Sequence, residues 1–272
     1  EGSECSFTNL FIWQGPLDIH WTQVGRAVCV VALNDGPVYA LHPCAEEAED
    51  AIAAAKALAE WFRLQGQPLL IRGLEQPLAK MLGETFLNWR IERDRDEDDY
   101  IYSVQELIEL KGRKFDAKRH HIRTFRRNTP DYAYEPMNAG NAIACIPVAR
   151  EWLERQHSSD EIMQAETVAI EQALTRFEDL KLSGGLIRVD GKIEAFTVGE
   201  ALCEDTVVIH IEKANPEIVG LYQMINREFL QNTWSHMTFV NREEDMGIPG
   251  LRAAKQSYRP IRMVEKYRAT ES

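Results

Sequence analysis

The apolar residues of this chain follow two alternating periods, that of a β-strand and that of an α-helix. Three short stretches are rich in β-branched and aromatic residues and separated by Gly or Asn-Asp-Gly-Pro turns, which predicts strands at 18–24, 26–33 and 37–42. The pattern then predicts a helix, a strand, a helix and a strand, at 46–65, 68–73, 76–87 and 88–93. The first half of the chain therefore has the pattern of a small α/β unit.

Two further helices are predicted in the middle of the chain. Ser103 is followed by Glu106 in a capping-box arrangement, so a helix should begin near Ser103 and end at Gly112. Residues 114–127 predict a second helix, with its apolar stripe among Lys and Arg residues, and the Asn-Thr-Pro that follows should end it.

The order of elements from the first half recurs after this region. A loop or strand at 132–145 should lead into helices at 147–156 and 160–181, the second capped by Ser159 or Asp160. Three strands are expected next, at 185–190, 192–200 and 205–212. A helix at 216–231, a strand at 236–241, a helix at 247–256 and a strand at 260–267 should follow.

This repeat concerns the order of elements alone, because no sequence repeat accompanies it. We predict an α/β (α+β) fold of two compact domains, 1–127 and 128–272, each of ordinary domain size.

Charge is distributed unevenly along the 272 residues. The net charge is -12, but residues 111–127 hold eight Lys and Arg and one acid, a local net charge of +7. The rest of the chain then carries -19. Such acidity argues against binding of nucleic acid or membrane by the whole surface and leaves one basic segment to explain.

The sequence also predicts a cytoplasmic location. The five cysteines are scattered and include no C-x-x-C pair, which is typical of free thiols in a reducing compartment. We expect no signal peptide, because no basic region followed by an apolar stretch opens the chain, and no transmembrane helix, because no window approaches 18 apolar residues.

The common enzyme fingerprints are missing. The chain has no phosphate-binding G-x-x-x-x-G-K-[ST], no G-x-G-x-x-G, no G-x-S-x-G and no H-E-x-x-H. We predict no metal site, since His120 and His121 are helical neighbours that point apart.

The basic helix is the first candidate site. Its cations recur at spacings of three to five, interleaved with histidine, and the set is Lys114, Lys118, Arg119, His120, Arg123 and Arg126. One positive face could clamp the phosphates of an anionic substrate or of the acceptor end of an RNA. The alternative is a solvated surface of a helix that bridges two acidic domains.

The segment 240–267 is the second candidate. It places Asn241 and Arg242 at a strand end, where α/β sheets bind ligands. A Gly/Pro-rich turn and a short helix with Arg252 and Lys255 follow, and this helix entry could hold a phosphate or carboxylate. Alternatively, the polar residues cap the helix and Arg242 pairs with the acids beside it.

Two glutamates complete the candidates. Glu212 directly follows the apolar strand TVVIHI, where a carboxylate could take a proton from an attacking amine. The alternative is an ordinary ion pair at a strand end. Glu166 lies on the apolar stripe of its helix, so it is either partnered at a site or reaches past the edge of the core.

Four runs of residues resemble a known family. They are YSVQELIELKGRKFDAKRHHIRTF, LIRVDGKIEAFTVGE, HIEKANPEIVGLYQMINREF and VNREEDMGIPGLRAAKQSYRP. Together they are similar to bacterial proteins related to the catalytic C-terminal domain of phosphatidylglycerol lysyltransferase. The resemblance implies two tandem GNAT-like (acyl-CoA N-acyltransferase) domains with mixed sheets and flanking helices, an architecture shared with Fem-type aminoacyl-tRNA-dependent transferases. It also implies that Tyr258 acts as general acid.

The sequence departs from the GNAT pattern where acetyl-CoA enzymes hold their cofactor. The glycine-rich loop before the helix is replaced by NPEIVGLYQ, with Gly220 alone, and in the first domain by the acidic HPCAEEAED. We therefore expect neither domain to cradle a CoA pyrophosphate. The membrane-spanning region of the lysyltransferases is also missing from this sequence.

These observations lead to one hypothesis and two alternatives. The protein is predicted to move an acyl group, specifically an aminoacyl group from a charged tRNA, onto an amine or hydroxyl acceptor, either a small molecule or a lipid headgroup. Glu212 would deprotonate the acceptor, Tyr258 would protonate the leaving oxygen, and the basic residues would hold phosphates. The alternatives are an N-acetyltransferase that uses acetyl-CoA or another acyl-CoA and a binding module without catalysis. A deep groove where 114–123 and 241–258 converge would favour an enzyme, whereas a filled interface there would favour the binding module.

Overall fold

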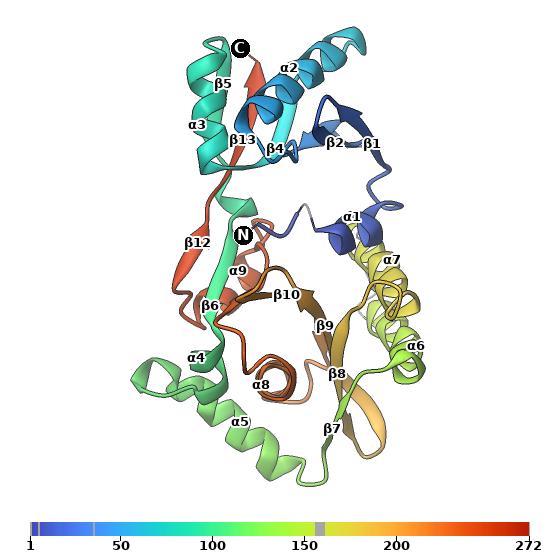
Figure 1. Cartoon of the computed structure of the whole chain (residues 1–272). Helices are drawn as coiled ribbons and strands as arrows, with labels where there is room; N and C mark the ends of the chain where they lie inside the picture. Colours follow the sequence, from blue (N-terminus) through green and yellow to red (C-terminus); the bar gives the residue numbers. More distant parts are fainter. Residues whose placement is uncertain (1, 5, 35, 156–160, 272) are drawn as a thin grey trace. The chain divides into compact units, whose positions relative to one another are not determined.

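The computed structural model describes residues 2–4, 6–34, 36–155 and 161–271 (Figure 1). These residues form two compact units that interleave along the sequence. We call residues 2–99, 244–249 and those from 263 onward the terminal unit, and residues 100–243 and 250–262 the central unit. Within the described residues, no helix is long and apolar enough to cross a membrane.

The terminal unit is built on a six-stranded sheet in the order β1-β2-β3-β4-β13-β5. Its strands are β1 (Ile19–Val24), β2 (Ala27–Ala32), β3 (Tyr39–Leu41), β4 (Leu70–Glu75), β5 (Trp89–Arg93) and β13 (Lys266–Glu271). Strands β3 and β4 are parallel and the other neighbours antiparallel. Its helices are α1 (Phe7–Trp13), α2 (Ala48–Leu64), α3 (Gln76–Thr85) and a 3₁₀ turn, Arg95–Glu97.

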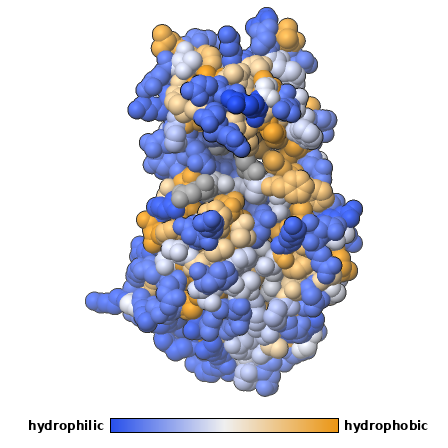
Figure 2. All heavy atoms as spheres, viewed as in Figure 1, coloured by the Kyte–Doolittle hydropathy of each residue, from blue (hydrophilic) through white to orange (hydrophobic). Residues whose placement is uncertain are grey.

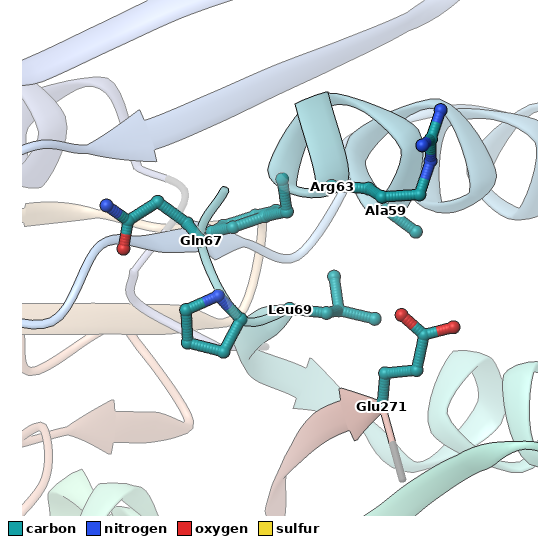
Figure 3. Close-up of a pocket in the computed structure, with 7 residues that line it drawn as sticks. Ala59, Arg63, Gln67, Leu69 and Glu271 are labelled. Carbon is teal, nitrogen blue, oxygen red and sulfur yellow. The ribbon is translucent and has the colours of Figure 1, made fainter. Parts of the chain in front are cut away.

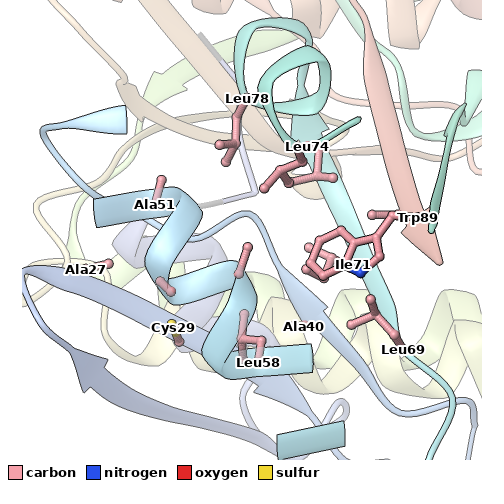
Figure 4. Packing of buried hydrophobic residues seen from close by; sticks show 14 of the residues in the cluster. Ala27, Cys29, Ala40, Ala51, Leu58, Leu69, Ile71, Leu74, Leu78 and Trp89 are labelled. Atoms are coloured by element: carbon pink, nitrogen blue, oxygen red, sulfur yellow. The ribbon is translucent and has the colours of Figure 1, made fainter. Parts of the chain in front are cut away.

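The core of the terminal unit lies between this sheet and the helices α2 and α3. Cys29, Ala40 and Ile71 of the sheet are fully buried in one cluster with Leu58 and Leu78 of the helices (Figure 4). Alanines fill much of the α2 face, so the helix can approach the sheet closely.

The second sheet has seven strands in the order β12-β6-β11-β10-β9-β8-β7. They are β6 (Asp99–Ser103), β7 (Ala133–Pro136), β8 (Ser183–Val189), β9 (Lys192–Ala201), β10 (Thr206–Ala214), β11 (Phe239–Asn241) and β12 (Arg262–Val264). The helices along this part of the chain are α4 (Val104–Glu109), α5 (Asp116–Asn128), α6 (Ala139–Arg155), α7 (Glu161–Thr175), α8 (Leu221–Thr233) and α9 (Pro249–Gln256), with a 3₁₀ turn at Arg113–Phe115.

The two sheets repeat one plan. Each contains three consecutive antiparallel strands, β1–β3 in one sheet and β8–β10 in the other, followed by a strand parallel to the third, β4 or β11; the second sheet has β7 in addition, antiparallel to β8. Each then contains a strand from elsewhere in the sequence, β13 next to β4 and β6 next to β11. In Figure 1 the red β13 lies between β4 and β5. The predicted α/β fold with two mixed sheets and a repeated element order is confirmed.

The division at residue 127 stays a prediction, and the compact units run differently from it. Helix α5 packs against α8, with Ile122 and Phe125 in one buried cluster with Leu221 and Met224. Residues 100–127 therefore belong to the same compact unit as the residues that follow them.

Several predicted boundaries are confirmed and others move. The Ser103 hydroxyl accepts a hydrogen bond from the Glu106 N–H at 3.3 Å, so the predicted cap of α4 is correct. Asp190 and Gly191 both have positive φ, as the predicted hairpin turn requires. The caps expected at 159–160 lie outside the described residues.

Three helices differ from the prediction. Helix α1 has no counterpart among the predicted elements. Helix α6 begins at Ala139 and contains Pro147, which was expected near the start of the helix. Helix α7 ends at Thr175, six residues before the predicted 181, and the chain turns before β8 through Lys181 with φ 54°.

Candidate functional site

The candidate site lies along β10 beyond the point where its neighbour β11 ends. The two strands pair only between Thr206–Val208 and Phe239–Asn241, so the second half of β10 has no β11 partner. Glu212 lies in that half, and both of its carboxylate oxygens accept hydrogen bonds. Arg242 Nη2 donates to Oε1 at 2.7 Å, and Asn226 Nδ2 of α8 donates to Oε2 at 2.9 Å.

Arg242 is the central cation of the site. Its guanidinium carbon lies 4.9 Å from the centre of the Tyr258 ring and 5.8 Å from that of Tyr102. Burial opposes its charge, but the Glu212 carboxylate and the tyrosines Tyr102 and Tyr258 together outweigh burial and raise the pKa of Arg242. Its Nη1 is buried and has no hydrogen-bond partner among the described residues. One nitrogen of the Arg242 guanidinium therefore has no hydrogen-bond acceptor among the described residues.

Tyr258 follows α9 and is 6% exposed. Burial raises its pKa well above the usual range, so its hydroxyl stays protonated at neutral pH. Tyr102 of β6 is buried as well and donates a hydrogen bond to the Lys255 carbonyl at 2.8 Å. The two tyrosines thus supply the aromatic walls around Arg242.

Lys118 reaches the site from the inner face of α5. Its Nζ lies 3.7 Å from the centre of the Tyr258 ring, and the residue is 9% exposed. Burial, together with the nearby Arg242 charge, lowers the pKa of Lys118 to about 8. At this point the segments 114–123 and 241–258 are in direct contact through Lys118 and Tyr258.

The turn after β11 fixes Arg242 through its backbone. The Asn241 side-chain oxygen accepts from the Glu243 N–H at 2.7 Å, and Lys255 Nζ donates to the carbonyls of Arg242 and Glu243. Asn241 is fully buried, and Glu243 has φ 55°. Both predicted site residues, Asn241 and Lys255, therefore hold the turn that presents Arg242.

His210 also contacts this turn, and it was not among the predicted residues. Its side chain is 1% exposed, and its two ring nitrogens lie 2.9 Å from Glu243 Oε1 and 3.0 Å from Glu200 Oε1. Burial disfavours the imidazolium, but the two carboxylates outweigh burial and raise its pKa to about 9. The signal was its position two residues before Glu212, in the same strand.

The outer face of the basic helix divides into paired and unpaired cations. Lys114 pairs with Glu106 at 2.7 Å, and Arg119 pairs with Asp116 while donating to the carbonyls of Leu110 and Gly112. His120 is exposed, and exposed Arg123 has no ion pair or hydrogen bond among the described residues. Figure 2, which has the view of Figure 1, shows mostly hydrophilic residues in its lower part, where Figure 1 places α5.

The remaining candidates lie elsewhere. Arg252 is half-buried on α9. Glu166 forms an ion pair with Lys213 at 2.7 Å, in agreement with the partnered alternative. The described residues contain no group of three or more His, Cys, Asp or Glu able to hold a metal ion. The chain also has a hollow of about 360 Å³ in the terminal unit, lined by Arg63, Gln67 and Glu271 among others, and it contains none of the predicted site residues (Figure 3).

Gly220 does not form a cradle for CoA. It adopts φ 88° at the start of α8, and a Cβ there would lie 2.2 Å from the carbonyl oxygen of His121 in α5. A glycine is needed at this position because the backbone of α5 lies where any other side chain would begin. The residues at this helix start therefore do not fit the pyrophosphate of a CoA cofactor.

The matching strand orders of the two sheets define a tandem GNAT-like fold of the Fem type. The model of the family described as "Phosphatidylglycerol lysyltransferase, C-terminal" matches residues 1–270, and the chain belongs to this family. A search of curated proteins finds no match.

Three solved structures illustrate the likeness. A conserved protein of unknown function from Bacteroides thetaiotaomicron is 34% identical with a TM-score of 0.90, over 99% of this chain and 91% of that one. L-PGS from Bacillus licheniformis is 16% identical with a TM-score of 0.68, over 99% and 93%. FemX is 10% identical with a TM-score of 0.62, over 95% and 90%.

Proposed function

We propose that this protein transfers an acyl group, specifically an aminoacyl group from a charged tRNA, onto an amine or hydroxyl acceptor in the cytoplasm. Membership of the phosphatidylglycerol lysyltransferase C-terminal family supports a transferase. The observation that carries the proposal is the buried Nη1 of Arg242, a donor without a partner among the described residues, beside the protonated Tyr258. A donor preorganised in a water-poor site is what a developing oxyanion requires.

The chemistry assigns a role to each group. The acceptor attacks the ester carbonyl, and Arg242 Nη1 stabilises the negative charge that forms on its oxygen. Tyr258 donates its proton to the ribose oxygen that leaves. Glu212 was predicted as the base, but both its oxygens already accept hydrogen bonds, which favours a role in holding Arg242.

The phosphates of the donor are assigned to the outer face of α5. Arg123 of α5 and Arg113 of the 3₁₀ turn before it are exposed and have no hydrogen bond or ion pair among the described residues. Lys114 and Arg119 are engaged within the protein, so they contribute less than the sequence predicted. The acceptor is a small molecule or a lipid headgroup.

The phosphate assignment is tested with a double variant and a charge-matched control. We expect Arg113→Ala with Arg123→Ala to weaken binding of aminoacyl-tRNA about tenfold and to reduce the salt slope by about 1 to 2. The control replaces Lys111 and Lys114 with Ala, because each of these lysines pairs with a glutamate. Equal losses in both variants, or no loss in the first, would contradict the assignment.

A binding module without catalysis is the second candidate. It is favoured by the filled contact among Lys118, Tyr258 and Arg242, which leaves little of these side chains exposed. Multiple turnovers with any donor would eliminate it. A CoA-dependent reaction is disfavoured by the contact of Gly220 with α5.

A further inference from the structure

Lys118 differs from the other buried or half-buried lysines of the chain. Lys213 pairs with Glu166, Lys255 donates to two carbonyls, and Lys266 pairs with Glu4 and Asp99. Lys118 instead faces a tyrosine ring and has no hydrogen bond or ion pair among the described residues. The ring face attracts an ammonium, but a buried ammonium with no hydrogen-bond acceptor is costly, and here burial outweighs the attraction and favours the neutral amine.

The charged and titratable groups that face Lys118 come from three elements. Arg242 follows β11, Glu212 lies on β10, and Tyr258 follows α9. Arg242 repels the ammonium form, while Glu212 attracts it but is already paired with Arg242. Burial and the Arg242 charge together outweigh the attraction of Glu212, and the pKa of Lys118 falls to about 8.

The other bases of the site are engaged. Both Glu212 oxygens accept hydrogen bonds, and both ring nitrogens of His210 contact carboxylates. Tyr258 holds its proton because burial raises its pKa. Among the described residues of this site, Lys118 is the group that is able to gain a proton near neutral pH.

We propose that Lys118, as a neutral amine, is the catalytic base that takes the proton from the attacking group of the acceptor. This inference rests on the proposed aminoacyl transfer and replaces the predicted phosphate contact of Lys118 by a different role. The contact of Nζ with the Tyr258 ring places the amine over the side chain that carries the proposed acid.

The proton balance of the step needs no other reactant. The acceptor nitrogen or oxygen bonds to the ester carbonyl carbon and its proton passes to Lys118 Nζ. The bond from this carbon to the ribose oxygen breaks, and that oxygen takes the proton of Tyr258. After the product leaves, Lys118 gives its proton to water and the tyrosinate takes one from water, so both residues are restored for the next turnover.

Competitive labelling tests the state of Lys118 without a substrate. Trace acetic anhydride is added to the full chain at a series of pH values from 6 to 11, and peptide mass spectrometry gives the titration of each lysine. Lys118 is expected to titrate at least one pH unit below exposed Lys192 of the β8–β9 hairpin. If the two lysines titrate together, Lys118 stays charged and the proposal is wrong.

Lys118→Arg tests the catalytic role. Arginine keeps the charge but cannot act as a base, so we expect kcat to fall about 10²- to 10⁴-fold with donor Kd within about twofold. A variant with the wild-type rate would show that Lys118 acts only as a cation. A wild-type protein without turnover would overturn the proposed function and the catalytic role with it, whereas a failed labelling result overturns the role of Lys118 alone.

Discussion

At the residue scale, the charged side chains of the site shift one another's pKa values and occupy one another's hydrogen-bonding atoms. Glu212 was predicted as a base from its position after an apolar strand, and it does lie beside the predicted Arg242 and Tyr258. The sequence could not reveal that Asn226 and Arg242 occupy both its oxygens, because these contacts join residues 14 and 30 positions away. His210 was missed because a histidine in an apolar strand is more often a core residue than a functional one.

The buried His210 gives a prediction about pH. Folding raises its pKa from 6.5 to about 9, so its stabilisation is complete below pH 6.5 and is lost as the pH rises through 9. We expect His210→Gln to lower the free energy of unfolding by about 2 kcal/mol at pH 6, and by less at pH 9. Urea unfolding at both pH values measures this difference.

The control for that experiment is His20→Gln, because His20 contacts Asp18 at the surface and both side chains are about 60% exposed. It should show no comparable dependence on pH. Because folding lowers the pKa of Lys118 to about 8, its deprotonation makes the folded state more stable as the pH rises above 8. This contribution is present in the wild-type protein and in each variant, so it cancels when their free energies of unfolding are subtracted. If the loss of unfolding free energy caused by His210→Gln grew from pH 6 to pH 9, the proposed ion pairs of protonated His210 with Glu200 and Glu243 would be contradicted.

At the scale of elements, local patterns predicted most helices and strands, and long-range packing set the exceptions. The Ser103 cap and the Asp190-Gly191 turn follow from a few neighbouring residues and were correct. Helix α8 was expected from 216 but begins at Leu221, because Gly220 adopts a left-handed conformation against α5. That contact joins segments about 100 residues apart, which no local period reveals.

Gly220 and Gly191 make a matched pair for testing this contact. Both have positive φ, but a Cβ at Gly191 would meet nothing within 4 Å, whereas one at Gly220 would meet the α5 backbone. Gly191→Ala should cost about 1 kcal/mol from backbone conformation alone. Gly220→Ala should cost about 3 kcal/mol or more, because overpacking adds to the conformational cost.

Denaturant unfolding of the two glycine variants measures both costs. Because α5 carries Lys118, displacement of the helix in Gly220→Ala should also raise the pKa of Lys118 in the labelling experiment. Equal costs for the two variants would show that α5 does not press on this glycine.

At the scale of the whole molecule, the sequence predicted the repeated order of elements but not the strands that each sheet takes from elsewhere. Strand β13 ends the chain and pairs with β4 and β5, while β6 from the first half pairs with β11. Pairing over such separations has no local signature. The predicted domains 1–127 and 128–272 therefore correspond only in part to the compact units.

This strand arrangement predicts that the first half of the chain does not fold alone. A fragment of residues 1–127 lacks β13, which lies between β4 and β5 in the sheet. It should show poor dispersion in NMR spectra and no cooperative unfolding, and coexpression with 128–272 should restore both. A fragment 1–127 that unfolds cooperatively by itself would support the predicted domain boundary instead.

The central claim is aminoacyl transfer at the site of Arg242, Lys118 and Tyr258, and the most direct test is the discharge of charged tRNA. A mixture of radiolabelled aminoacyl-tRNAs is incubated with the protein, amine and hydroxyl small molecules and phospholipid vesicles, with acetyl-CoA as the rival donor. We expect transfer of the label from tRNA to an acceptor and a rate about 10²- to 10⁴-fold lower in Tyr258→Phe, which removes only the hydroxyl. Consumption of acetyl-CoA without tRNA discharge, or no discharge above the buffer rate, would contradict the central claim.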